Sequence, residues 1–127
     1  MGGSAGHVSI ALARRFPNLN FVVQDFKETV EASEKTLPAE FKGRVSFQAH
    51  DFFNPQPVRA EVYMMRHICH CWPDKYLIKI LQQTVLAMDP GSRIIVMETV
   101  VLPPGQYGFL EERWARYGRY LQCYMFV

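Results

Sequence analysis

The alternation of short apolar segments with longer helical patterns constrains the fold of this 127-residue chain more than any other feature. The apolar segments are rich in Val, Ile, Phe and Tyr and are bounded by turn residues, which is typical of strands. Several are nearly continuous apolar runs, as expected for parallel strands that are covered on both faces. Strands are therefore predicted at residues 19–24, 44–49, 60–66 and 93–101.

Helical patterns separate these segments and predict helices over residues 5–16, 26–37, 73–88 and from Phe109 onward. On the first helix, Val8, Leu12 and Phe16 fall on one stripe at helical spacing, so we expect them to face the core. The third helix begins at Pro73, a residue suited to a first turn. The order helix, strand, helix, strand, strand, helix, strand, helix predicts an α/β fold with a parallel sheet and right-handed crossovers.

The two ends differ from those of a full domain of this kind. The chain opens with a Gly-rich loop, residues 1–6, that leads into a helix with no strand before it. Its final residues, 119–127, are strongly apolar. We therefore expect a partial domain over residues 1–127, truncated at both ends, whose sheet has a gap where its central strand would lie.

Charge and cysteine content exclude several classes of function. The net charge is +2 and is spread evenly along the chain, which argues against a nucleic-acid or anionic-membrane partner. No apolar run approaches the roughly 18 residues that a membrane span needs. The chain has three cysteines, and an odd number is a poor disulfide framework. A reducing, cytoplasmic compartment is the simpler expectation.

A Gly-rich stretch opens the first helix, and an acidic residue ends the strand that follows it. Gly2, Gly3 and Gly6 would let the backbone approach a ligand closely, and the helix N-terminus offers free N–H groups. Asp25 follows Gly6 by about twenty residues, where nucleoside-binding domains carry the acid that contacts ribose hydroxyls. The glycine spacing departs from G-x-G-x-x-G, so the pattern does not require the ligand to contain a diphosphate. An ordinary Gly-rich turn is the alternative.

A second acidic residue ends the next strand. Asp51 and the aromatic Phe52 lie at the carboxyl end of that strand. A carboxylate and an aromatic ring at the carboxyl end of a strand suit the edge and the face of an adenine. An Asx turn beside a core phenylalanine would produce the same pattern.

Residues 67–72 read HICHCW and carry two histidines and two cysteines. A structural zinc site needs four converging ligands, usually as two separated pairs. On a strand, neighbouring side chains such as His70 and Cys71 should diverge, so no metal site is predicted. The Cys-x-Cys spacing does not match a redox pair either. The remaining interpretations are one functional histidine at the end of the strand or a core histidine.

Four segments resemble one known family. In order and spacing, GGSAGHVSIALARRFPNLNFVVQD, HDFF, MRHICHCWPDKYLIKIL and PGSRIIVMETVVLPPG resemble the catalytic domain of class I S-adenosylmethionine-dependent O-methyltransferases. The plant caffeic-acid type and its fungal secondary-metabolite relatives are the most similar. The H-x-W-x-D stretch from His70 to Asp74 is the most specific part, and the resemblance covers nearly the whole chain. It implies a Rossmann-like methyltransferase sheet with flanking helices.

The resemblance implies a role for each residue that matches the family pattern. The general base falls on His70, and one of two carboxylates that flank it falls on Glu98. Asp25 would bind the ribose, and Asp51 with Phe52 would bind the adenine. The residues implied to bind S-adenosylmethionine are Gly2, Gly3, Gly6, Asp25, Asp51, Phe52 and Arg66.

The resemblance also implies a reaction and partners. The reaction is transfer of a methyl group to a hydroxyl, typically phenolic, of a small aromatic substrate, and it requires no metal. A homodimer is implied for full-length members, through an N-terminal helical domain that this chain lacks. The second flanking carboxylate should lie past Val127, and the pattern from Leu110 to Leu121 matches the family's substrate-pocket helix.

Two other functions stay open at this point. The chain could be a non-catalytic remnant that acts through protein contacts, or a nicotinamide-dependent dehydrogenase. The glycine spacing and the His-x-Trp stretch disfavour the dehydrogenase. Cys69 and Cys71 are expected to be packing residues, and His67 is expected to point away from His70.

Overall fold

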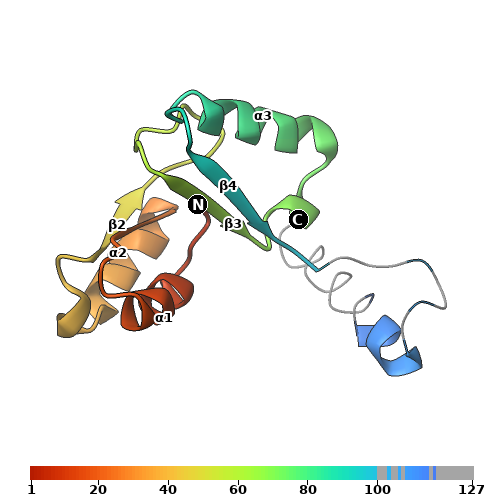
Figure 1. Cartoon of the computed structure of the whole chain (residues 1–127), viewed down its shortest axis with the longest axis horizontal. Coiled ribbons are helices and arrows are strands. Elements are labelled where there is room, and N and C mark those ends of the chain that lie inside the picture. The colour runs from red at the N-terminus through yellow and green to blue at the C-terminus, as the bar shows by residue number, and fades with distance from the viewer. Residues whose placement is uncertain (100–102, 104–105, 107, 115, 117–127) are drawn as a thin grey trace.

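The computed structural model describes residues 1–99, 103, 106, 108–114 and 116 (Figure 1). Each predicted helix and strand within residues 1–99 is present, and the structure adds two short 3-10 helices, η1 and η2, that the sequence pattern did not predict. Residues 109–114 are also helical. The elements are α1 (His7–Arg15), β1 (Phe21–Asp25), α2 (Lys27–Thr36), η1 (Ala39–Phe41), β2 (Val45–Ala49), β3 (Val62–Arg66), η2 (Cys69–Cys71), α3 (Asp74–Val85) and β4 (Arg93–Met97).

The described strands form two parallel pairs. β1 pairs with β2, and the register sets Phe21 opposite Val45 and Asp25 opposite Ala49. β3 pairs with β4, and the register sets Val62 opposite Arg93 and Arg66 opposite Met97. The parallel α/β arrangement predicted from the sequence is confirmed. Since parallel strands share one direction, the carboxyl ends within each pair meet at one edge.

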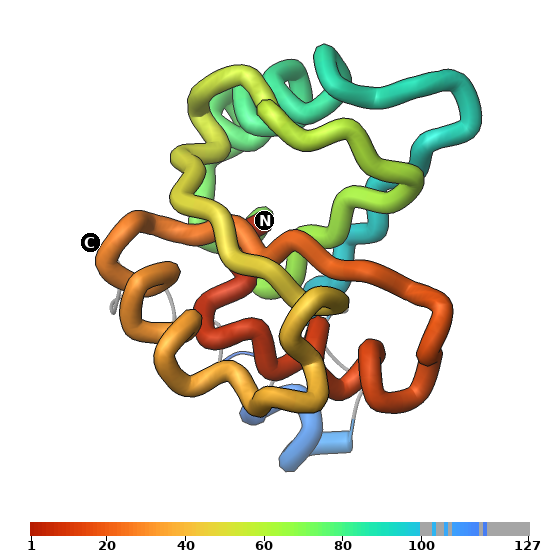
Figure 2. The backbone as a smooth tube through the Cα atoms, turned by 90° about the vertical axis from the view of Figure 1, so that its left-hand side faces the viewer, coloured from red at the N-terminus to blue at the C-terminus, as the bar shows by residue number. Residues whose placement is uncertain are grey.

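The two strand pairs are not hydrogen-bonded to each other, which confirms the predicted gap in the sheet. Figure 2 shows the N-terminus lying between the two halves of the molecule. There the amino group of Met1 donates a hydrogen bond to the carbonyl of Met64 on β3, at 3.0 Å. The N–H of Gly3 donates to the carbonyl of Gln24 on β1, also at 3.0 Å. The first three residues thus link β1 with β3 at the level of the Gly-rich loop.

The first half of the molecule has an apolar core between its helices and the β1–β2 pair. Ala13, Val23, Phe41 and Val45 are buried and cluster together. The expectation for Phe16 is wrong, because α1 ends at Arg15 and Phe16 takes an extended conformation that leaves it 47% exposed. Ala13 is the buried residue of α1, and Val8 and Leu12 of the predicted stripe are partly buried.

The second half is built from β3, β4 and α3, which lies along the strands in Figure 1. Met65, Ile80 and Thr84 are fully buried there. The hydroxyl of Tyr63 donates to the carbonyl of Ala87, which ties β3 to the end of α3 at 3.0 Å. Buried polar groups need such partners, so this hydrogen bond helps to fix the position of α3 relative to β3.

The helices in the described part of the chain are short. The longest element, α3, has 12 residues. No helix in the described part of the chain is both long and apolar enough to cross a bilayer.

Candidate functional site

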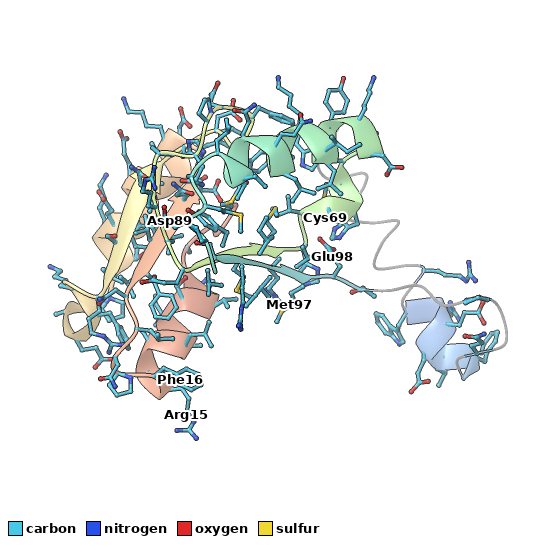
Figure 3. The ribbon with its side chains drawn as sticks, turned by 45° about the horizontal axis from the view of Figure 1, so that its top comes forward. Arg15, Phe16, Cys69, Asp89, Met97 and Glu98 are labelled. Atoms are coloured by element: carbon cyan, nitrogen blue, oxygen red, sulfur yellow. The ribbon has the colours of Figure 1, made fainter. Side chains whose placement is uncertain are left out.

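The two ends of the strands carry different surface pockets. One pocket lies at the carboxyl ends and is lined by Gly2, Asp25, Phe26, His50, Asp51 and Phe52. The other lies at the amino ends of β3 and β4 and is lined by Arg59–Glu61 and Asp89–Ser92. Figure 3 shows Asp89 at one end of β4 and Glu98 beside Cys69 at the other. In open α/β sheets ligands bind at the carboxyl ends, so the first pocket is the candidate site.

The Gly-rich loop needs glycine at specific positions. Gly2 has a φ of +60°, and a Cβ there would collide with the Cδ1 atom of Ile68. Gly6 has a φ of +73° at the start of α1, and a Cβ there would lie 3.1 Å from the ring of Phe47. Both positions combine a left-handed backbone with close packing, which only glycine accepts without strain. Of the predicted glycines, Gly2 lines the pocket and Gly3 and Gly6 do not.

Asp25 lines the pocket and also holds the loop. Its Oδ2 atom accepts a hydrogen bond from the N–H of Ser4 at 2.8 Å, and its Oδ1 atom accepts one from the N–H of Phe26 at 2.8 Å. Each carboxylate oxygen has a second lone pair. The carboxylate is thus oriented by the backbone and retains acceptor capacity toward the pocket.

Asp51 and Phe52 line the same pocket. The Oδ1 atom of Asp51 accepts a hydrogen bond from the N–H of Phe53 at 3.0 Å, which is the Asx turn considered as the alternative. Phe52 is only partly buried, and its ring meets that of Trp72 edge to face, with centroids 5.9 Å apart. The turn therefore positions the pair beside the pocket and beside the segment that carries His70.

Two residues at the carboxyl edge depart from the sequence prediction, Arg66 and His50. Arg66 is exposed at the end of β3 and does not line the pocket. His50 was not predicted from the sequence but lines the pocket between the two acidic residues. Burial lowers the pKa of His50, a shift that the charge of Asp51 opposes and the N-terminal amino group reinforces. The position of His50 directly after a predicted strand is the sequence signal that could have identified it.

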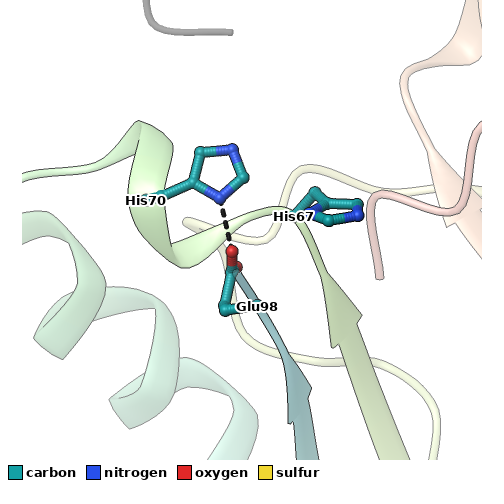
Figure 4. A group of neighbouring side chains, drawn as sticks. All are labelled: His67, His70 and Glu98. Carbon is teal, nitrogen blue, oxygen red and sulfur yellow. Dashed lines mark hydrogen bonds and ion pairs between the residues drawn. The ribbon is translucent and has the colours of Figure 1, made fainter. Parts of the chain in front are cut away.

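His70 and Glu98 form a partly buried pair at the same edge (Figure 4). The Nδ1 atom of His70 contacts the Oε2 atom of Glu98, and their side chains are 8% and 15% exposed. The Oε1 atom of Glu98 accepts hydrogen bonds from the N–H groups of Ile68 and Cys69, at 2.8 and 2.7 Å. One carboxylate thus shapes the turn between β3 and η2 and orients the histidine ring. The structure brings the two predicted catalytic residues together.

The contacts of Glu98 also change acid–base behaviour nearby. Burial alone would raise the pKa of Glu98, but hydrogen bonds from His70 and from the backbone N–H groups, together with the charge of His70, lower it. Burial raises the pKa of the Cys69 thiol, and the neighbouring Glu98 charge raises it further. Glu98 is therefore favoured as a carboxylate and Cys69 as a neutral thiol. This agrees with a packing role for Cys69 rather than a nucleophilic one.

The expectation for His67 is wrong. Its ring lies beside that of His70, with centroids 5.7 Å apart, rather than pointing away. The strand ends at Arg66, His67 takes a left-handed conformation with a φ of +56°, and η2 follows. Strand alternation therefore does not apply to residues 67–72. A left-handed histidine is uncommon, and nothing in the sequence pattern indicated it.

The chain matches one protein family over most of its length. A family model described as an O-methyltransferase domain matches residues 1–116. The chain belongs to this family. The resemblance recognised from the four sequence segments is thereby confirmed.

Similar proteins of this O-methyltransferase family occur in fungi. The chain is 45% identical over 118 residues to a grayanic acid biosynthesis cluster O-methyltransferase of Cladonia grayi, covering 91% of this chain and 26% of the relative. It is 48% identical over 122 residues to the O-methyltransferase pgmB of Aspergillus terreus, covering 91% of this chain and 34% of the relative. The chain thus spans about a quarter to a third of these curated relatives.

A solved structure has the same fold. The complex of LepI with S-adenosylmethionine matches 97% of this chain and 30% of its own, with a TM-score of 0.78 and 33% identity. The described part of this chain therefore has the arrangement of a segment of that larger protein.

Proposed function

We propose that this chain is the cofactor-binding part of an S-adenosylmethionine-dependent O-methyltransferase. In this proposal His70 is the general base, and a phenolic hydroxyl of a small aromatic metabolite is the acceptor. The observation that carries it is the partly buried His70–Glu98 pair at the same strand edge as the pocket formed by the Gly-rich loop and Asp25.

The residues of the pocket fit the cofactor. A glycine loop that a Cβ would obstruct lies beside an oriented carboxylate, Asp25, which suits a ribose diol. Asp51 and Phe52 follow the neighbouring strand and suit an adenine edge and face. Arg66 is proposed to contact the cofactor from the end of β3, where its side chain is exposed to solvent. S-adenosylmethionine would supply an activated methyl group on a sulfonium.

The proton is the part of the reaction that this chain must handle. A phenol has a pKa of about 10 and a free histidine one of about 6.5, so neutral imidazole can accept the proton as attack proceeds. The Nδ1 atom of His70 contacts Glu98, so Nε2 is the proposed acceptor of the hydroxyl proton. No proton acceptor other than this ring is needed in the proposal.

Glu98 acts on the reaction through His70. Its carboxylate contacts Nδ1, which selects the tautomer with its lone pair on Nε2 and favours the imidazolium that forms. Its hydrogen bonds to Ile68 and Cys69 hold the turn that carries the ring. The same group therefore orients the base and offsets its developing charge.

The name of one relative supports a class of acceptor. The relative in Cladonia grayi is named for a grayanic acid biosynthesis cluster. By similarity, we propose that the acceptor is a secondary metabolite. Simple phenols are the appropriate first probes.

Calorimetry with S-adenosylmethionine tests the proposal. We expect measurable heat and an increase in the unfolding temperature of the 127-residue chain, because a ligand at 100 times its Kd stabilises the folded state by about 2.7 kcal/mol. A nicotinamide dinucleotide serves as the control and should give neither effect. The absence of heat and stabilisation with S-adenosylmethionine would favour a remnant that acts through protein contacts.

A further inference from the structure

Three potential metal ligands converge at the carboxyl edge. His67, His70 and Glu98 each offer one nitrogen or oxygen atom, and these atoms all lie within 4.8 Å of one another. They come from three places in the chain: the turn after β3, η2, and the residue that follows β4. Figure 4 shows the His67 ring beside the His70–Glu98 pair.

The backbone around the three side chains is itself held in place. The N–H of His67 donates to the carbonyl of Met97 at 3.0 Å, which ties the turn to the end of β4. Glu98 then closes the turn through the N–H groups of Ile68 and Cys69. Ligands that are oriented by neighbouring hydrogen bonds bind metals more tightly than mobile ones.

One ring atom of the group lacks a partner. The Nδ1 atom of His67 is buried and accepts or donates no hydrogen bond among the described residues. Buried polar atoms are satisfied in the great majority of cases, so an unsatisfied one needs an explanation such as a bound ion. This observation is independent of the spacing of the three side chains and also points to a ligand.

We propose that His67, His70 and Glu98 bind a divalent transition-metal ion of the zinc type. Two imidazoles and one carboxylate form a three-ligand set that zinc accepts, and imidazole donors disfavour Mg²⁺ and Ca²⁺, which prefer oxygen. Ligand atoms around tetrahedral zinc lie about 3.4 Å apart for bonds of about 2.1 Å. Small side-chain rotations therefore have to adjust the separations between the three ligand atoms when the ion binds.

The ion would inhibit methyl transfer, a consequence that rests on the proposed function. Bound at Nε2, it occupies the lone pair that would accept the hydroxyl proton. Bound at Nδ1, it leaves the hydrogen of the neutral ring on Nε2, which again cannot accept a proton. The ion also separates His70 from Glu98 in the second case. Either geometry makes zinc an inhibitor that a chelator removes.

Metal binding is measured on the 127-residue chain without cofactor or substrate. Zn²⁺ is titrated in competition with a chromophoric chelator, and Co²⁺ is used for visible absorption. His67→Ala should weaken Zn²⁺ binding by at least about tenfold, because losing even an outer partner of a ligand costs that much. His7→Ala is the matched control, since His7 is an exposed histidine at the start of α1.

Two results would overturn the inference: equal Zn²⁺ affinity in His67→Ala and His7→Ala, or a thiolate-to-Co²⁺ charge-transfer band, which would assign the ion to the cysteines. Weaker binding in His67→Ala, with no thiolate band, supports it. The two proposals can fail separately. If the chain binds Zn²⁺ through His67 but transfers no methyl group in metal-free buffer, the proposed function is contradicted and the metal site is not. If the chain transfers methyl groups, Zn²⁺ does not inhibit the transfer, and Zn²⁺ binding does not depend on His67, the metal site is contradicted and the proposed function is not.

Discussion

Asp25 and Glu98 are two carboxylates at the same edge of the fold, but they are held by different contacts. Asp25 is oriented by two backbone N–H groups and faces an open pocket. Glu98 is 15% exposed and contacts a histidine ring in addition to two N–H groups. The first arrangement leaves acceptor capacity for a ligand. In the second, both oxygens of the Glu98 carboxylate already contact protein groups.

The comparison separates two parts of the candidate site. We call Gly2, Gly6, Asp25, Asp51 and Phe52 the cofactor side, and His67, His70 and Glu98 the histidine side. The cofactor side is shaped by turns at the strand ends and by the hydrogen bond from the N–H of Ser4 to Asp25. The histidine side depends on a contact between residues 28 positions apart. Changes on the first side should therefore affect binding, and changes on the second should affect turnover.

The largest effect is expected on the histidine side. His70→Gln should lower turnover about 10²- to 10⁴-fold, because it removes the general base, with little change in cofactor affinity. Initial rates with methyl-labelled S-adenosylmethionine and a panel of simple phenols measure this. His7→Gln is the control and should retain the rate. Equal loss of turnover and cofactor affinity in His70→Gln would contradict the assignment.

On the cofactor side, the largest effect is expected at Gly2. Gly2→Ala should destabilise the fold by about 2 kcal/mol and weaken cofactor binding, because the Cβ collides with Ile68 in addition to the strain of a positive φ. Gly43→Ala is a matched control, since Gly43 has a φ of +89° with nothing within 4 Å of a Cβ. It should cost about 1 kcal/mol. Equal losses in denaturant unfolding would show that the close approach to Ile68 does not matter.

A smaller effect on affinity is expected at Asp25. Asp25→Asn should weaken S-adenosylmethionine binding about tenfold, or by about 1.4 kcal/mol, because a charged acceptor for the ribose becomes neutral. Turnover at saturating cofactor should change little. Asp89→Asn, at the opposite end of β4, is the control, and calorimetry measures both. Unchanged affinity in Asp25→Asn would remove this residue from the cofactor side.

The smallest effect is a dependence of stability on pH at His50. The pKa of His50 is lowered in the folded state, so the unfolded chain binds more protons as pH falls below about 6.5. Folded stability should therefore decrease as pH falls through that window and should be flat above it. His50→Gln should reduce this loss in thermal unfolding between pH 5 and 7.5. The same slope in His50→Gln and the wild type would assign the dependence to other groups.

The sequence signals for the cofactor side are local. Glycines before a helix, and acidic residues that end strands, identify the carboxyl edge without knowledge of distant contacts. The parallel α/β arrangement followed from the order of the elements, whereas the sequence did not predict which strands pair. Arg66 was assigned by resemblance alone, and the exposed end of β3 offers no described contact that would support it independently.

The histidine side was less accessible from the sequence. Pairing of His70 with Glu98 followed from the family resemblance, since residue spacing alone does not reveal which strand ends are adjacent. The orientation of His67 was missed because a left-handed residue and a 3-10 helix replace the end of the predicted strand. Phe16 was misassigned because the helix ends one residue earlier than its apolar stripe. Segments such as 117–121 lie outside the described residues.

The central claim is that Glu98 acts on turnover through His70, and a double-mutant cycle tests it most directly. Turnover is measured in His70→Gln, Glu98→Gln and the double variant, with cofactor saturating. If the pair acts as a unit, the double variant should be no slower than His70→Gln alone, because the carboxylate has no base left to orient. Losses that multiply in the double variant would contradict the claim and would give Glu98 a separate role.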